Sequence, residues 1–226
     1  MSFKILYVTA TRAEAESLSG IKEMIPFPGG YLYGNLEIKL LVAGVGAITT
    51  AWSMKQWLAS NDKPDLAINA GIAGSYIDDI NIGAVVMPVS DCFADSGIED
   101  GENFLTLSDA GLIKADEFPF SDGVINADAE YCEKMKGVLK QVKAITVNTG
   151  TGSEYTRSKL IKKFNPDIET MEGATFFYIC CLESIPFLAL RAISNKVELR
   201  NKRNWNIPLA LNNLSEKLID VLLTLK

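Results

Sequence analysis

Short apolar runs alternate with amphipathic segments along most of the chain, which predicts strands separated by helices. Continuous apolar runs such as Ile5–Val8 and Ala84–Pro88 are typical of strands buried on both faces of a sheet. The predicted strands are Ile5–Val8, Tyr31–Gly34, Glu37–Ala43, Leu66–Asn69, Ala84–Pro88, Ala144–Asn148 and Phe187–Ile193. The predicted helices are a segment that begins at Thr11 or Arg12, a segment opened by Gly44-Val45-Gly46 that runs through Ser60, and Ala129–Lys140, Glu154–Phe164, Thr170–Leu182 and Pro208–Leu225.

Strands that alternate with helices indicate an α/β sheet covered by helices on both faces. We find no internal repeat, no low-complexity tract and no linker, so a single domain over residues 1–226 is expected. The stretch from Cys92 to Asp122 is different, because it is rich in Asp, Glu, Gly and Ser and lacks sustained periodicity. It is predicted to be a long excursion over one face and a candidate lid.

Composition and charge limit the partners that this chain can have. Its 226 residues are 48% hydrophobic and carry a net charge of −6, which argues against nucleic acid as a partner. No apolar run is long enough to span a membrane, and the first residues lack the apolar core of a signal peptide. Cys92, Cys132, Cys180 and Cys181 show no metal-ligand spacing, so reduced thiols in a cytoplasmic protein are expected.

The chain contains no histidine. This excludes a nucleophile paired with histidine, a histidine-rich zinc site and an imidazole general base. Catalysis would have to use carboxylates, amides, hydroxyls, lysine, cysteine or backbone groups. The acidic stretch Asp95–Glu102 lacks the spacing of a calcium loop, and we expect neither a metal site nor a cofactor.

Candidate binding loops follow four predicted strands, after Val8, Ala43, Asn69 and Asn148. Ligands of open α/β sheets bind beyond the carboxyl ends of the strands, and glycine lets backbone amides approach a ligand closely. The last three of these loops are rich in glycine, although an ordinary tight turn would explain any one of them. None carries a complete dinucleotide fingerprint or a phosphate-loop lysine.

Two glutamates stand at the starts of predicted helices. Glu172 precedes an almost wholly apolar helix, where a carboxylate must be hydrogen-bonded and could accept from a vicinal diol. Glu14 lies in the first turn after the first strand and could act as a general base. Both residues could equally be plain helix-start acids, which are favoured at that position.

A third group of candidates follows the strand Phe187–Ile193. The amide of Asn195 can reach the same edge of the sheet, and residues 196–205 form the only concentrated basic stretch. This stretch is either a solvated loop or an anchor for an anionic substrate group, for which arginine has suitable bidentate geometry.

These positions together resemble the nucleoside phosphorylase and nucleosidase superfamily over nearly the whole chain. The matching pieces are Glu14, Gly44-Val45-Gly46, Asn69–Gly74, Thr170-Met171-Glu172-Gly173-Ala174 and Arg191-Ala192-Ile193-Ser194-Asn195. The resemblance implies a three-layer α/β/α fold with a central mixed twisted sheet, and an enzyme that cleaves the N-glycosidic bond of a small nucleoside.

The resemblance also implies roles for individual residues. Glu14 would activate the attacking water, Met171 and Glu172 would hold the ribose, and Asn195 would lie beside the base. Further substrate contacts are implied at Gly71, Ile72, Ala73, Gly74 and Thr149. The base-stacking aromatic stays open among Phe93, Phe104 and Tyr155. No cofactor is implied, and a homo-oligomer, a dimer or larger, is expected.

Asn195 marks a departure from the adenosine-type nucleosidases, which carry aspartate there. An amide is a poor general acid but can hydrogen-bond O6 or N7 of a 6-oxopurine, which favours hypoxanthine as the leaving base. The segment from Arg191 to Leu211 most resembles the futalosine hydrolases of menaquinone biosynthesis, whose substrate carries a carboxylated aromatic group. Arg200 or Arg203 is our hypothesis for the anchor of that carboxylate.

Three alternatives stay open at this stage. The first is a methylthioadenosine/S-adenosylhomocysteine nucleosidase, which Asn195 disfavours. The second is a phosphorolytic purine nucleoside phosphorylase, for which Arg12 could bind phosphate although the charge of Glu14 would repel it. The third is a non-catalytic ligand-binding protein, which would leave the presence of both Glu14 and Glu172 unexplained.

Overall fold

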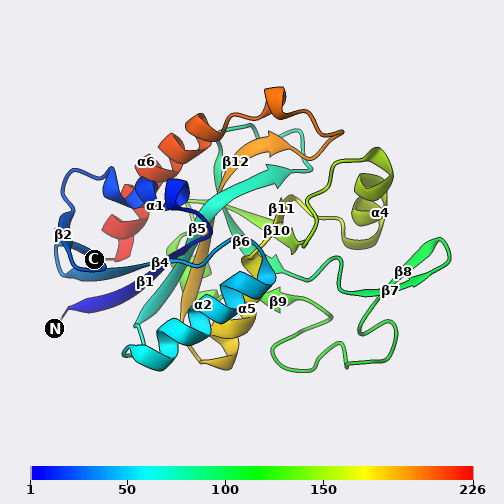
Figure 1. The fold of residues 1–226 in the computed structure, drawn as a ribbon, viewed down its shortest axis with the longest axis horizontal. Helices are drawn as coiled ribbons and strands as arrows, with labels where there is room; N and C mark the ends of the chain where they lie inside the picture. The colour runs from blue at the N-terminus through cyan, green and yellow to red at the C-terminus, as the bar shows by residue number, and fades with distance from the viewer. Residues whose placement is uncertain (1, 226) are drawn as a thin grey trace.

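The computed structural model describes residues 2–225 and shows one large mixed sheet between two layers of helices (Figure 1). The strands of this sheet run in the spatial order β11-β10-β6-β12-β5-β1-β4-β3-β2, and β9 pairs with β6. Their bounds are β1 Phe3–Thr9, β2 Ile25–Phe27, β3 Gly30–Tyr33, β4 Leu36–Val42, β5 Leu66–Ser75, β6 Val85–Asp91, β9 Ile125–Asn126, β10 Lys140–Thr146, β11 Ile168–Thr170 and β12 Phe187–Lys196.

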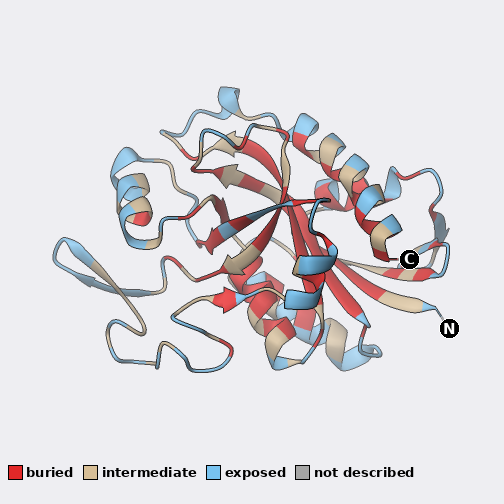
Figure 2. Cartoon of the chain, turned by 180° about the vertical axis from the view of Figure 1, so that it is seen from behind, coloured by how far each residue is buried: buried red, intermediate tan, exposed pale blue. Residues whose placement is uncertain are grey.

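Helices cover both faces of the sheet, as the alternating pattern predicts. Helices α1, α3 and α6 pack on one face, and α2 and α5 pack on the other. In Figure 2 the strands between these layers are buried, whereas the outer sides of the helices are exposed. The helices are α1 Arg12–Ser19, α2 Ala47–Ser60, α3 Ala129–Lys134, α4 Glu154–Phe164, α5 Gly173–Leu182, α6 Ile207–Leu225 and the short 3-10 helix η1 Lys202–Asn204.

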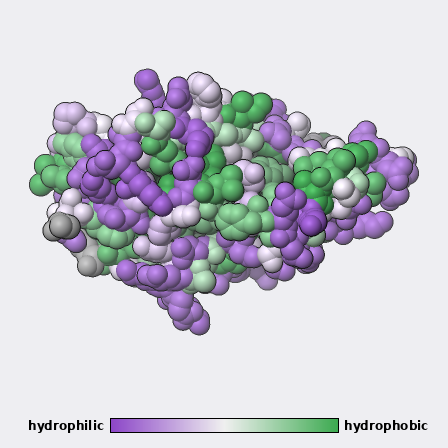
Figure 3. Space-filling model, turned by 90° about the horizontal axis from the view of Figure 1, so that it is seen from below, coloured by the Kyte–Doolittle hydropathy of each residue, from purple (hydrophilic) through white to green (hydrophobic). Residues whose placement is uncertain are grey.

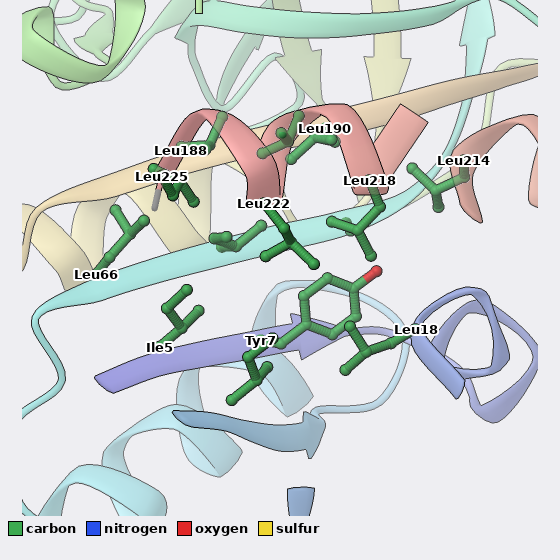
Figure 4. Packing of buried hydrophobic residues seen from close by; sticks show 14 of the residues in the cluster. Ile5, Tyr7, Leu18, Leu66, Leu188, Leu190, Leu214, Leu218, Leu222 and Leu225 are labelled. Carbon is green, nitrogen blue, oxygen red and sulfur yellow. The ribbon is translucent and has the colours of Figure 1, made fainter. Parts of the chain in front are cut away.

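Strand β1 shows why the central strands are apolar at successive positions. Ile5 and Tyr7 point into the core beneath α1 and α6, while Leu6 and Val8 point into the core beneath α2 and α5. Figure 4 shows the first of these cores, where leucines of α6 meet residues of β1, β5 and β12. A strand with a core on each side has no solvent face, so the usual polar alternation is lost.

One end of the sheet curls into a closed ring of strands. Strand β11 pairs in parallel with β10 and in antiparallel with β5, so β5, β12, β6, β10 and β11 form a small barrel. Since β1, β4, β5 and β12 run parallel to one another, their carboxyl ends meet at one edge. This edge is where the sequence places its candidate residues.

The ends of several predicted strands shift by a few residues, and β12 runs past Ile193 to Lys196, so Asn195 lies within it. Four further sequence predictions need correction. Strand β5 extends to Ser75, because Gly71–Gly74 pair with β12 instead of forming a loop. Helix α3 ends at Lys134, and the chain turns through Gly137 at φ +83° before β10 begins. Helix α5 begins at Gly173, because Ile168–Thr170 form strand β11.

The fourth correction concerns the stretch from Cys92 to Asp122. It contains a two-stranded hairpin of β7 Gly97–Asp100 and β8 Asn103–Thr106, which forms a small sheet of its own. This hairpin projects from the body of the molecule in Figure 1. All four cysteines are free; Cys92 and Cys180 are buried, and Cys132 and Cys181 are half-buried. No helix in residues 2–225 is long and apolar enough to cross a membrane.

Candidate active site

A cavity of about 240 Å³ opens at the shared carboxyl edge of β1, β5 and β12. Segments far apart in the sequence form its wall, because each follows or ends a strand of the sheet. The wall includes Thr11 and Glu14 from the start of α1, Ile72, Ala73 and Gly74 from β5, Gly150 and Thr151 after β10, Glu169 from β11, Met171 and Glu172 before α5, Ser194 and Asn195 from β12, and Arg200 and Trp205 from the final loop.

Glu14 is fixed in this cavity by three hydrogen bonds. Its Oε2 accepts from the backbone amide and the hydroxyl of Thr11, both at 2.8 Å, which completes a capping box at the start of α1. Its Oε1 accepts from the backbone amide of Ile72 in β5 at 3.0 Å. Glu14 is therefore a helix-start acid and also a buried, oriented carboxylate with 6% exposure.

Gly71 leaves room for this carboxylate. A methyl group on Gly71 would lie 2.5 Å from Oε1 of Glu14, which is closer than real contacts allow. Gly71 itself is not part of the cavity wall, and the structure gives it a steric role behind Glu14, while its predicted substrate contact stays a prediction. Its neighbours Ile72, Ala73 and Gly74 do line the cavity.

Glu172 reaches the cavity from the start of α5. It is the N-cap residue of α5, but its side chain makes no hydrogen bond to that helix. Its Oε1 accepts instead from the backbone amide of Gly46, the N-cap of α2, at 2.8 Å. Burial raises the pKa of Glu172, and the Gly46 amide and the charge of Arg191 oppose that rise.

Arg191 is a buried cation behind the two glutamates, and its sequence context predicts no role for it. With 2% exposure, it donates to the backbone oxygens of Asn69 at 3.0 Å and Leu190 at 2.9 Å and to the side-chain oxygen of Asn69. Burial lowers the pKa of Arg191, and the negative charges of Glu172, Glu14 and Asp91 oppose that change. This guanidinium balances buried carboxylates that it does not contact directly, since none forms an ion pair with it within residues 2–225.

Asp91 is a second residue missed from the sequence. Its Oδ1 accepts from the hydroxyl of Thr146 at 3.0 Å, and that hydroxyl oxygen accepts from the backbone amide of Ala174 in α5 at 2.7 Å. Within residues 2–225, Oδ2 of Asp91 has no hydrogen-bond partner. Burial raises the pKa of Asp91 to about 7.

Asn195 lies beyond a register shift in β12 and pairs with Gly74 of β5. Its Oδ1 accepts from the hydroxyl of Ser194 at 2.7 Å, and its Nδ2 donates to the backbone oxygen of Lys196 at 2.9 Å. The ammonium group of Lys196 donates in turn to three backbone oxygens of residues 77–80. The amide is thus held in place and keeps one N–H and one lone pair for a ligand.

Other predicted contacts lie outside the cavity wall. Thr149 is exposed, and its backbone amide donates to Asp95 at 3.4 Å, whereas Gly150 and Thr151 line the cavity. Arg203 is exposed on η1, whereas Arg200 lines the cavity. Of the cationic residues in the basic stretch, Arg200 is therefore the one that lines the cavity.

The three aromatic candidates make contacts elsewhere in the structure. Phe93 packs against Tyr178, Phe104 packs against Phe164, and Tyr155 lies beneath the ammonium group of Lys159. None of the three candidates lines the cavity, whereas Trp205 does.

The candidate lid and the acidic stretch take no part in this cavity. No residue of Cys92–Asp122 belongs to the cavity wall. Among the residues that the structure describes, no cluster of acidic or cysteine side chains could hold a metal ion.

Comparison with known proteins matches the sequence of this chain to one family. Residues 5–225 match the family model described as the phosphorylase superfamily. A futalosine hydrolase of Streptomyces coelicolor is 32% identical to this chain over 78% of the chain and 75% of the relative. A 5′-methylthioadenosine/S-adenosylhomocysteine nucleosidase of Listeria monocytogenes is 26% identical over 79% of the chain and 78% of the relative.

A solved structure shows the same fold. The futalosine hydrolase of Helicobacter pylori superposes with a TM-score of 0.78 at 20% identity, over 97% of each chain. The predicted nucleoside phosphorylase-like α/β fold is therefore confirmed.

Proposed function

Because this chain belongs to the phosphorylase superfamily, we propose that it hydrolyses futalosine to hypoxanthine and dehypoxanthine futalosine, in menaquinone biosynthesis. The observation that supports this most strongly is that Glu14, Glu172 and Asn195 line one cavity. The three side chains come from distant parts of the sequence. They combine two carboxylates, which suit sugar chemistry, with an amide, which suits a 6-oxopurine.

Glu14 is the general base in this proposal. Water attacks C1′ of the ribose as the bond from C1′ to the purine nitrogen breaks, and the carboxylate of Glu14 accepts a proton from that water. The sugar passes through an oxocarbenium-like state, whose positive charge the nearby carboxylates stabilise. The hydrogen bonds from Thr11 and Ile72 hold Glu14 in one orientation for this step.

Glu172 and Met171 hold the ribose, and Ile72, Ala73 and Gly74 form the floor beneath the substrate. The carboxylate of Glu172 accepts from the sugar hydroxyls while the Gly46 amide keeps it in position. The amide of Asn195 hydrogen-bonds O6 or N7 of the base as negative charge develops there. Because asparagine donates no proton outright, adenine, which leaves best after protonation at N7, is the poorer leaving base.

Arg200 anchors the carboxylate of the aromatic extension. It is exposed at the mouth of the cavity, where a bidentate contact with a carboxylate can form. Trp205 lies in the same wall and offers a surface for an aromatic ring. Arg203, the other candidate anchor, remains the weaker choice because it lies outside the wall.

Hydrolysis is favoured over phosphorolysis by the charges in the cavity. Glu14, Glu169 and Glu172 line it and would repel a phosphate, while Arg12 lies outside the wall. Arg200, the cationic side chain in the wall, stands at the mouth.

The enzyme is further proposed to be a cytoplasmic homo-oligomer. Four free thiols agree with a reducing compartment. Ile48 and Trp52 of α2 are 84% and 68% exposed, a pair of large apolar side chains that a second copy would cover. Figure 3 shows hydrophobic surface among hydrophilic residues on the side of the molecule where α2 and α5 lie.

The test is a substrate panel. Purified protein is incubated with futalosine, inosine or methylthioadenosine, with and without phosphate, and the released base is identified by chromatography. We expect hypoxanthine from futalosine without phosphate. Adenine from methylthioadenosine as the main product would favour the methylthioadenosine nucleosidase, phosphate dependence would favour the phosphorylase, and no release would favour a binding protein.

A further inference from the structure

Glu169 is a buried carboxylate in the cavity wall to which neither the sequence motifs nor the proposed mechanism assigns a contact with the substrate. It lies in β11 with 9% exposure. Its position in the sheet is informative, because Glu169 pairs with Gly74 from one side and Asn195 pairs with the same glycine from the other. Paired residues of neighbouring strands point to the same face, so the carboxylate and the amide flank the space above Gly74.

The hydrogen bonds of Glu169 leave one acceptor site open. Oε2 accepts from the hydroxyl of Tyr76 at 2.6 Å and from the hydroxyl of Thr151 at 2.5 Å. Oε1 accepts only from the backbone amide of Thr151, at 2.8 Å, among the described residues. A carboxylate oxygen has two lone pairs, so Oε1 keeps one for a donor on a ligand in the cavity.

A 6-oxopurine presents such a donor next to the atoms assigned to Asn195. Its N1–H and its N7 lie on either side of O6, whereas adenine has at N1 a lone pair that a carboxylate would repel. We infer that Glu169 selects 6-oxopurine nucleosides by accepting a hydrogen bond from N1–H. This inference rests on the proposed function and adds a second specificity residue to Asn195.

A purely structural role for Glu169 makes a different prediction. Its bonds to Thr151 hold the loop after β10, so replacing Glu169 could disturb the cavity as a whole. Tyr76→Phe provides the matched control, since Tyr76 bonds the same carboxylate but is not part of the cavity wall. A loop defect lowers activity on all purines alike, whereas a lost N1 contact changes the preference among them.

The experiment measures kcat/KM for futalosine and for its adenine-bearing analogue with the wild-type protein, Glu169→Gln and Tyr76→Phe. In Glu169→Gln, an amide oxygen at the position of Oε2 keeps the hydroxyl donors of Tyr76 and Thr151. The NH2 group then takes the position of Oε1, where it loses the bond from the Thr151 backbone amide and presents an N–H to the base. We expect the preference for futalosine over the analogue to fall about 10- to 100-fold in Glu169→Gln and to stay constant in Tyr76→Phe. A preference that Glu169→Gln leaves unchanged, or that Tyr76→Phe changes equally, overturns the inference.

A second measurement needs no folded variant. In 1-deazainosine a ring C–H replaces N1–H and the mobile proton moves to N3 or O6, so the compound lacks the donor at position 1, and the wild-type protein should process it about 10- to 100-fold less efficiently than inosine. Equal efficiency overturns the role of Glu169 while leaving the proposed function intact. If the wild-type protein releases no hypoxanthine from futalosine or inosine, the proposed function itself is wrong, and the inference fails with it.

Discussion

The carboxylate of Glu14 accepts a hydrogen bond from the backbone amide of Ile72 at 3.0 Å, across 58 positions of sequence. This bond joins the start of α1 to the carboxyl end of β5 and aims a charged oxygen into the cavity. The water-activating role that we propose for Glu14 depends on this arrangement, and two substitutions test it separately.

Replacing Glu14 by Gln removes the charge and keeps the shape of the side chain. We expect kcat to fall about 100- to 10,000-fold, because the general base is lost, while substrate affinity changes little. Single-turnover kinetics and binding of a substrate analogue measure the two effects. Glu16→Gln, on the exposed side of the same helix, is the matched control, and similar kcat values for both variants would exclude Glu14 as the base.

Replacing Gly71 by Ala moves Glu14 without changing any residue of the cavity wall. The new methyl group would lie 2.5 Å from Oε1 of Glu14, so the carboxylate must shift. A displacement of this size is expected to lower kcat about 100-fold. Gly20→Ala is the control, because its methyl group meets nothing closer than 3.4 Å. Wild-type turnover in Gly71→Ala would show that the position of Glu14 is not critical.

The stability of the fold should depend on pH through Asp91. The usual pKa of aspartate is 3.8, and burial raises the pKa of Asp91 to about 7. Below about pH 4 the group is protonated in both the folded and the unfolded chain. Between about pH 4 and 7 the unfolded chain releases a proton that the folded chain retains, so the free energy of unfolding falls as pH rises and then levels off.

Asp91→Asn tests this dependence. The amide resembles the protonated acid in shape, so we expect the Tm of the variant relative to wild type to increase from pH 5 to pH 8. Melting curves at several pH values measure it, with Asp95→Asn at an exposed position as the control. A Tm difference that does not vary with pH would contradict the raised pKa.

Substituting Arg200 and Arg203 in turn distinguishes a specific anchor for the substrate carboxylate from a general effect of positive charge. Arg200→Ala should raise KM for futalosine about tenfold and leave KM for inosine unchanged, because inosine lacks the carboxylate. Arg203→Ala removes the same charge outside the cavity wall and should change neither value. Steady-state kinetics with futalosine and inosine measure these KM values. Equal KM values for futalosine in the two variants would refute the role of Arg200 as the anchor.

Local signals in the sequence identified much of the fold. The start of α1 was predictable because Thr11 and Glu14 form a capping box within four residues. Helix α4 has the predicted bounds and Ser153 as its N-cap. The predicted length of helix α3 is too great because the apolar spacing continues to Leu139. The chain turns at Gly137 because strand β10 begins shortly after it.

Long-range contacts account for what the sequence did not reveal. Strand β11 has three residues, too few for a recognisable pattern, and its pairing with β5 closes the barrel. Glu169 acquires its place in the cavity only through that pairing. Arg191 lies in an apolar strand, and its partner Asn69 is 122 positions away, so no local spacing could indicate a buried cation.

The most direct test of the central claim follows the oxygen atom that enters the sugar. Wild-type protein is incubated with futalosine in water labelled with heavy oxygen and without phosphate, and the sugar product is examined by mass spectrometry. If Glu14 activates water for attack on C1′, dehypoxanthine futalosine formed in a single turnover carries one heavy oxygen, and hypoxanthine appears in equal amount. Product that forms only when phosphate is added, or hypoxanthine release without labelled sugar, would contradict hydrolysis at this site.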